Sequence, residues 1–401
     1  MTEHDVVRQV SYIQQALSQN RKPIGFFIGA GCPLSIRVNH RTVADQPTSD
    51  PLIPDVAGLT SIINDALKGK DGAEKQTSWD KVIKIVKDDG GDAKNIEYIL
   101  TKIRLLASVA GKGTVRDLNS EELSELDKEI CSKISALVEK ELPDQKGPYH
   151  NLAIWTRSIK REQPVHIFTT NYDLLLEQAF EESSAPYFDG FVGTRNAFFD
   201  LGAVEDEGIL PPRWSRLWKI HGSLNWKIDA FNNVVRSDKV SEGQKHLIYP
   251  SHLKYDQSRK MPYLAMLDRL KDFLLKPSSV LFTSGYSFAD EHINDVICRA
   301  LISNPTAHVF ALLFGSLGDA KYEQAKQCGL STPNLSVFSF DSAIVGRLLG
   351  SWKNMEVPFS LPPGIVIPHE NETTCELKLG DFMQFGNLIR NLTSANEDAD
   401  G

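Results

Sequence analysis

Short apolar runs alternate with helical patterns along most of the chain. Continuous apolar or β-branched runs over residues 24–28 and 165–170 stop abruptly at glycine or at polar residues. A short run of this kind is typical of a strand that is buried on both faces of a parallel sheet. The later pattern predicts strands over 279–287, 308–314 and 335–340, with helices between them and over 342–349. Strands separated by helices predict an α/β fold with a mostly parallel, doubly wound sheet.

Amphipathic helical patterns fill the region between the first two strands. Asp55 is placed to cap the first of them, and the following patterns repeat apolar residues every three or four positions. Such faces are typical of helices that pack on a core. They predict a helical insert over about residues 55–143, which is longer than a crossover between parallel strands requires. Residues 6–17 predict a further helix, and Asp290 is placed to cap another.

Two segments follow neither pattern. Residues 35–54 are polar, contain several prolines and have no periodicity, so they predict a long functional or mobile loop after the first strand. The region after residue 350 is rich in proline over 358–368, and its later alternation predicts a small hairpin and a short helix before a solvated acidic tail. The predicted organisation is therefore one domain over 1–350 and a C-terminal extension over 351–401.

Composition argues against several classes of protein. The chain has 401 residues, 41% of them hydrophobic and 24% charged, as expected of a globular protein with a substantial core. Its net charge of -8 argues against a general nucleic-acid binder. No apolar run nears membrane-spanning length and the N-terminus lacks the pattern of a signal peptide, so no membrane partner is expected. The five cysteines form no C-x-x-C pair, which predicts a protein of the reducing cytoplasm without bound metal.

Unusual residues gather where four of the predicted strands end. The four segments are Gly29–Gly31, Thr170–Asp173, His221–Ser223 and Thr283–Ser287. The carboxyl ends of parallel strands share one rim of a sheet, where α/β proteins bind ligands. Asn171 and Asp173 can hydrogen-bond a ligand there, although both residue types also cap helices. His221 can act as a base or serve structurally, and glycines after a strand let a backbone approach a phosphate.

In order and spacing these segments resemble the nucleotide-binding and catalytic motifs of the sirtuin family. The specific part is Thr170-Asn171-Tyr172-Asp173 together with Lys219-Ile220-His221-Gly222-Ser223. More closely, residues 20–350 look like the bacterial branch of sirtuin-like NAD hydrolases found in anti-phage defence. The resemblance implies a Rossmann-like fold that binds NAD as its substrate.

The resemblance also implies roles for individual residues. His221 matches the family's catalytic histidine, and Asn171 and Asp173 would lie near the nicotinamide ribose and carboxamide. The residues implied to bind the nucleotide are Gly29, Ala30, Gly31, Pro54, Asp55, Thr170, Ser284, Gly285 and Ser287. Among these, the glycine turn would approach the pyrophosphate, and the loop of Pro54 and Asp55 would lie on the nicotinamide side.

Two departures from the family pattern limit what the resemblance implies. The paired zinc-binding cysteines of deacetylating sirtuins are missing, which counts against protein deacylation. The segment from Cys32 to Ser35 replaces the usual small residue and serine, so Cys32, Ser35 and Arg37 receive no definite role. The remaining residues suit cleavage of the nicotinamide–ribose bond, which develops oxocarbenium character. Asp173 or the loop at Asp55 would hold the carboxamide, His221 would polarise the ribose hydroxyls and Asn171 would orient water.

The sequence therefore predicts an NAD glycohydrolase that forms nicotinamide and ADP-ribose. The alternatives are an NAD-dependent deacylase, an ADP-ribosyltransferase, or a non-catalytic sensor or scaffold, and the fold alone does not decide among them. In length and layout the chain resembles the sirtuin-like subunits that work beside a HerA-type ring ATPase. This resemblance implies that ATPase as a partner, a role in anti-phage NAD depletion, and a homo-oligomer held by the helical insert or the C-terminal hairpin.

Overall fold

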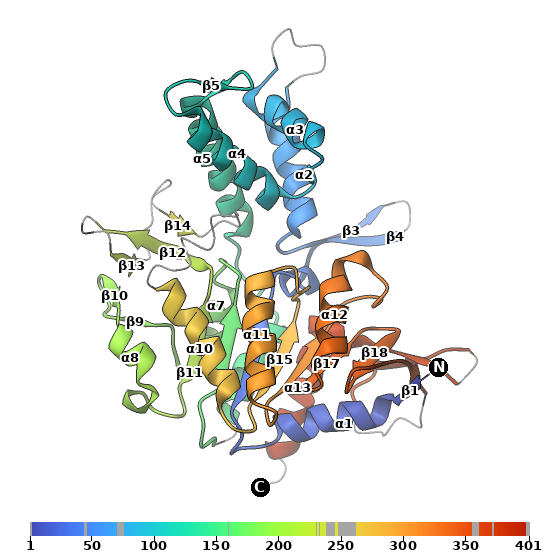
Figure 1. The fold of residues 1–401 in the computed structure, drawn as a ribbon. Helices are drawn as coiled ribbons and strands as arrows, with labels where there is room; N and C mark the ends of the chain where they lie inside the picture. The colour runs from blue at the N-terminus through green and yellow to red at the C-terminus, as the bar shows by residue number, and fades with distance from the viewer. Residues whose placement is uncertain are drawn as a thin grey trace.

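The computed structural model describes most of the chain and is shown in Figure 1. The described residues are 2–43, 46–69, 76–158, 160–229, 231, 233–237, 245–247, 262–354, 361–370 and 373–397. Among them, no helix is both long and apolar enough to cross a membrane.

The central sheet has ten described strands and is mostly parallel. In spatial order these are β1 (Thr2–Asp5), β19 (Leu348–Lys353), β18 (Ser342–Val345), β17 (Leu335–Phe338), β16 (His308–Leu312), β15 (Val280–Ser284), β2 (Ile24–Ile28), β7 (His166–Thr169), β11 (Ser215–Lys219) and β8 (Tyr187–Phe188). Only the pairings of β18 with β17 and with β19 are antiparallel. The predicted α/β fold with a mostly parallel sheet is confirmed, and β2, β7, β11 and β15 end at the same rim.

Helices cover both faces of this sheet, so neighbouring side chains on one strand enter different cores. The described helices around the sheet are α1 (Val6–Leu17), α6 (Pro148–Ser158), α7 (Leu175–Glu182), α8 (Leu201–Glu205), α10 (Tyr263–Leu275), α11 (Glu291–Ser303), α12 (Glu323–Ser331) and α13 (Phe382–Glu397). Phe26 packs in the core that includes α1, α6, α7 and α13, whereas Phe27 packs in the core that includes α8, α10, α11 and α12. This alternation explains why β2 is apolar at every position.

The helical insert stands above the rim where these strands end (Figure 1). It contains α2 (Val56–Leu67), α3 (Ser78–Asp88), α4 (Ile96–Ala110) and α5 (Ser120–Val138), with the short strands β5 (Thr114–Val115) and β6 (Leu118–Asn119) between the last two helices. Asp55 caps α2 as predicted, because its carboxylate accepts a hydrogen bond from the Gly58 amide at 2.8 Å. Capping boxes begin α3 and α5.

A second, antiparallel sheet continues from the central one through the turn that carries His221. Its strands in spatial order are β14 (Lys245–Leu247), β12 (Gly222–Ile228), β13 (Val234–Arg236), β10 (Ala197–Phe199) and β9 (Phe191–Val192). Because β12 follows β11 after two residues, the histidine turn joins the two sheets.

The structure corrects two predictions of secondary structure. Residues 35–54 were expected to be a long loop, but β3 (Arg37–Val43) and β4 (Gln46–Pro51) form an antiparallel hairpin after the 3-10 turn η1 (Pro33–Ser35). The predicted helix over 342–349 is wrong, because β18 and β19 form a hairpin there. The turn residues Gly346 and Arg347 both have positive φ, as a two-residue hairpin turn requires.

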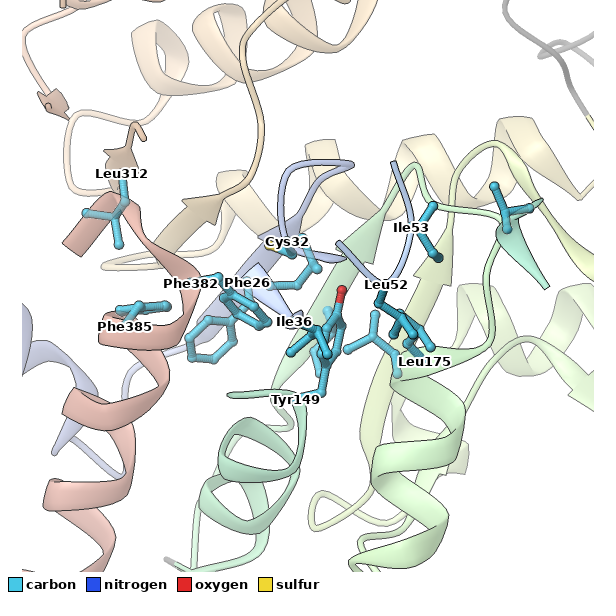
Figure 2. Close-up of a cluster of buried hydrophobic side chains, with 14 of the residues drawn as sticks. Phe26, Cys32, Ile36, Leu52, Ile53, Tyr149, Leu175, Leu312, Phe382 and Phe385 are labelled. Carbon is cyan, nitrogen blue, oxygen red and sulfur yellow. The ribbon is translucent and has the colours of Figure 1, made fainter. Parts of the chain in front are cut away.

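The C-terminal region joins the main core. A hairpin is present as β20 (Val366–Pro368) and β21 (Cys375–Leu377), but it precedes most of the alternation around Gly380 from which a hairpin was predicted. A 3-10 turn and the sixteen-residue α13 occupy that segment, and the helix is longer than expected. Phe382 and Phe385 at its start are buried beside Phe26 and Tyr149 (Figure 2). The predicted acidic tail lies largely outside the described residues. The remaining short turns are η2 (Glu207–Ile209), η3 (Ala320–Tyr322) and η4 (Lys378–Gly380).

Candidate functional site

A cavity of about 250 Å³ lies between the strand rim and the helical insert. The predicted site residues that line it are Ala30, Pro54, Thr170, Asn171, Asp173, His221, Gly285 and Ser287. The insert contributes mainly apolar side chains, including Val56, Leu59, Leu100, Ile134 and Val138. The cavity therefore joins a polar floor of strand ends to an apolar roof, which is the usual composition of a small-molecule site.

Four other predicted residues surround the cavity without lining it. Gly29 and Gly31 pack against Gly285, and the Gly31 amide donates a hydrogen bond to the Gly285 carbonyl at 2.8 Å. A Cβ atom on Gly29 would lie 2.3 Å from that same oxygen. Ser284 is fully buried, and Asp55 is an exposed helix cap. The glycines therefore let two strand-end turns interlock, and their contact with a pyrophosphate stays a prediction.

Asn171 presents an unsatisfied acceptor in this floor. Its backbone amide donates to the Thr169 hydroxyl at 3.0 Å, and its side-chain Nδ2 donates to the Gly29 carbonyl at 3.2 Å. The bond to Gly29 holds the side chain in place, and the residue is only 8% exposed. Its Oδ1 atom is buried and has no partner among the described residues. A buried amide oxygen without a partner is costly, so a ligand or water that donates a hydrogen bond is favoured there.

Asp173 lies just before α7 and lines the cavity. Its Oδ1 atom accepts a hydrogen bond at 3.1 Å from the amide of Leu175, the first residue of the helix, although the N-cap position is Leu174 and has no side-chain cap. Burial raises the pKa of this carboxyl group to about 6, although the nearby Lys219 ammonium opposes the rise. The Lys219 ammonium donates to the Asp173 carbonyl and, at 2.8 Å, to Glu177 Oε1. The carboxyl group of Asp173 is therefore ionised at neutral pH and can titrate near pH 6.

Replacing Asp173 with asparagine is expected to stabilise the fold at neutral pH. The pKa is raised above its ordinary value of 3.8, so folding favours the protonated form and stability falls as pH rises from about 4 to about 6. Raising the pKa of Asp173 from 3.8 to about 6 lowers the free energy of unfolding by about 3 kcal/mol, and this whole loss is present above pH 6. Asparagine keeps the acceptor for Leu175 and does not ionise. Urea unfolding at several pH values should show the variant's advantage at pH 7 shrinking towards zero near pH 4; a difference independent of pH would contradict this cause.

His221 lies beside an acidic residue that the sequence had suggested only as a helix cap. Its Nε2 atom is 3.5 Å from Asp290 Oδ2, and both residues line the cavity. The other oxygen of Asp290 accepts hydrogen bonds from the amides of His292 and Ile293 at the start of α11. The cap thus holds the carboxylate in place while its second oxygen faces the imidazole. Because β15 and β11 are not neighbours in sequence, local patterns gave no signal for this pair.

The residues that depart from the sirtuin pattern serve the structure around the site. Cys32 is fully buried, and its thiol donates to the Ser284 carbonyl at 3.2 Å while burial raises its pKa. The Ser35 hydroxyl donates to the Cys32 carbonyl at 2.8 Å. Arg37 is exposed and contacts Ser49 in the hairpin. In the part of the chain that the structure describes, no group of three or more His, Cys, Asp or Glu side chains is placed to hold a metal ion; metal independence stays a prediction.

Comparison with known proteins finds a family match in the second part of the chain. Residues 165–332 match the SIR2-like domain family, a span that includes β7, the His221 turn and β15. Similar solved structures include a Sir2 homolog–NAD complex, with a TM-score of 0.36, 11% identity and coverage of 82% of this chain and 96% of that chain. They also include a mutant Sir2 homologue–ADP ribose complex, with a TM-score of 0.37, 10% identity and coverage of 96% and 97%. No curated protein matches.

Proposed function

We propose that this chain is a sirtuin-like NAD glycohydrolase that cleaves NAD into nicotinamide and ADP-ribose. The observation that carries the proposal is the convergence of Asn171, Asp173 and His221 on one cavity at the rim of the sheet. All three lie within the span that matches the SIR2-like domain family. The match supports NAD as the ligand, and the side chains support hydrolysis at the glycosidic bond.

The chain's own groups suit the charge that develops during this cleavage. Departure of nicotinamide leaves positive charge on the ribose, as in glycoside hydrolysis. The carboxylate of Asp173, ionised above about pH 6, and that of Asp290 supply negative charge at the cavity wall. The unpartnered Oδ1 of Asn171 can accept a hydrogen bond from a water or a hydroxyl group. His221 can take up a proton, with Asp290 stabilising the charged imidazole.

The apolar roof complements these groups. Ile53, Pro54 and Val56 line the same cavity and offer a surface for an aromatic ring such as nicotinamide. An apolar wall also strengthens the electrostatic interactions inside the site by limiting water. Most of the roof comes from the helical insert, which Ile53 and Pro54 directly precede, so movement of this insert would control access.

The wider biological role follows the same resemblance. The proposed enzyme acts in anti-phage defence by depleting NAD in the cytoplasm, as a homo-oligomer beside a HerA-type ring ATPase. A constitutive NAD hydrolase would drain its own cell, which is the reason to expect a partner that controls activity.

The test uses the purified full chain incubated with NAD, alone and with the co-expressed ATPase. Nicotinamide and ADP-ribose are followed by chromatography, with and without an acetylated lysine peptide. Equal amounts of both products without peptide would support the glycohydrolase. Release that requires the acyl peptide would support a deacylase, modified protein would support an ADP-ribosyltransferase, and binding without release under all conditions would support a sensor.

Replacing Asp290 with asparagine is expected to slow nicotinamide release without unfolding the protein. Asparagine keeps the oxygen that caps α11 but removes the charge beside His221. We expect kcat to fall by up to about a hundredfold, within the range of a positioned acid–base group. An unchanged kcat would show that Asp290 is only a helix cap.

A further inference from the structure

A second cavity, of about 970 Å³, lies on the other side of the strand-end loop at residues 172–174. Leu174 lines this second cavity, whereas Tyr172 and Asp173 line the first. Its walls come from α7, from β8 at the edge of the central sheet and from strands β9, β12 and β13 of the second sheet. The cavity therefore lies where the two sheets meet, and no residue of the proposed NAD site lines it.

The walls of this cavity carry an excess of negative charge. The acidic side chains that line it are Glu139, Glu141, Glu177, Glu181, Glu182 and Asp189. Among the described residues that line it, only Lys140 and Arg236 are basic, and Arg236 is paired with Asp189. Two groups from outside the lining contact the acidic residues: the Lys219 ammonium contacts Glu177, and the His150 ring contacts Glu182. A cationic ligand is therefore favoured by the charge of the cavity.

Three buried polar atoms in the walls point to a ligand more specifically. Glu177 is only 8% exposed; its Oε1 atom meets Lys219, but its Oε2 atom has no partner among the described residues. The Oδ1 atom of Asn225 and the indole Nε1 of Trp214 are likewise buried and unpartnered in the described part of the chain. The first two atoms need hydrogen-bond donors, and the third needs an acceptor.

Aromatic side chains form another part of the wall of this cavity. Tyr187, Phe188 and Phe191 line the cavity together with Trp214. A guanidinium group stacks on aromatic faces and presents several donors in one plane, whereas an ammonium group is compact and more strongly hydrated. A peptide carbonyl supplies the acceptor that the Trp214 indole lacks, which a free polyamine does not.

We propose that this cavity binds an arginine-bearing peptide segment of a partner protein. The guanidinium group meets Glu177 and Asn225, and a carbonyl of the same segment accepts from Trp214. Lys219 links this cavity to the first one, because its ammonium group contacts both Glu177 and the backbone of Asp173. A second cation on Glu177 competes with Lys219 for the carboxylate and so acts on the loop that lines the first cavity.

The test measures peptide binding by calorimetry, with the full chain and without NAD. The probe is an acetylated Gly-Arg-Gly amide, and its matched control replaces arginine with citrulline, which has the same shape without the charge. We expect the citrulline peptide to bind at least about tenfold more weakly, because a hydrogen bond to a charged group is lost. Binding of the arginine peptide should also weaken as salt is added. Equal binding of both peptides, or no binding of either, would overturn the proposal.

Variants locate the site. Glu177→Gln should weaken binding of the arginine peptide by at least about tenfold. Glu129→Gln changes an exposed residue of α5 and should leave this binding unchanged. Asn225→Ala provides a second variant, because the Oδ1 atom of Asn225 has no partner among the described residues and its removal breaks no hydrogen bond to that atom. Spermidine that binds as tightly as the peptide would show a general polycation site instead. Since no arm contains NAD, failure here leaves the proposed hydrolase untouched, and an inactive hydrolase leaves this site testable.

Discussion

Replacing His221 with alanine is expected to abolish nicotinamide release while the protein stays folded. His221 lies at a strand end and lines the cavity, so its loss removes the proposed proton acceptor without emptying an apolar core. We expect kcat to fall by at least about a hundredfold, which is the typical contribution of a positioned acid–base group. The measurement is product formation by chromatography, with circular dichroism as the test of folding.

Two further variants sharpen this result. His292→Ala changes an exposed histidine at the start of α11 and should keep the wild-type rate. Asn171→Ala should lose activity as His221→Ala does, at a stability cost of about 1 kcal/mol from the lost hydrogen bond to Gly29. An unfolded His221→Ala protein would place the histidine among the structural residues. A folded variant with full activity would remove it from the mechanism.

Replacing Gly29 with alanine is expected to cost about 3 kcal/mol or more of stability. The new Cβ would lie 2.3 Å from the Gly285 carbonyl oxygen and 2.7 Å from its carbon. Both are backbone atoms at the end of β15, so relief requires a shift of one strand-end turn against the other. Gly285 has a φ of +65° and is itself enclosed by Cys32, which leaves little room for adjustment.

Gly113→Ala is the matched control for this substitution. The nearest atom to a Cβ at Gly113 is the Ala110 carbonyl oxygen, at 3.5 Å, which is ordinary contact. Urea unfolding of the two variants should therefore show a large loss for Gly29→Ala and little change for Gly113→Ala. Equal stabilities would mean that the two turns separate easily, and the interlocked arrangement would be wrong.

The sequence predicted the parts of the fold that local pattern determines. The five-residue runs of β2 and β15 are buried at every position because both sheet faces are covered. The carboxyl ends of such strands share a rim, so the grouping of Asn171 with His221 followed from the parallel arrangement alone. Asp55 and Asp290 were visible as caps because capping depends on residues three positions away.

The sequence did not reveal features that depend on long-range contacts. The hairpin of β3 and β4 has exposed polar residues such as Arg41 and Asp50, which form an ion pair at 2.7 Å, and an exposed hairpin needs no apolar alternation. The hairpin of β18 and β19 resembled a helix because its apolar residues do not alternate with burial: Ala343 and Ile344 are buried, whereas Leu348 and Leu349 are exposed. The contact of Asp290 with His221 joins segments that follow two separate strands, so the spacing of residues along the chain does not predict it.

The position of α13 has a consequence for how the protein is made. This helix is synthesised last among the described elements, yet Phe385 packs 6.2 Å from the ring of Phe26, which is synthesised near the beginning. Gly380, just before the helix, fits so closely against the Leu313 carbonyl that no side chain has room there. The sheet therefore cannot complete its core while residues 382–397 are still inside the ribosome. Folding to the native state is therefore delayed until that helix has left the ribosome.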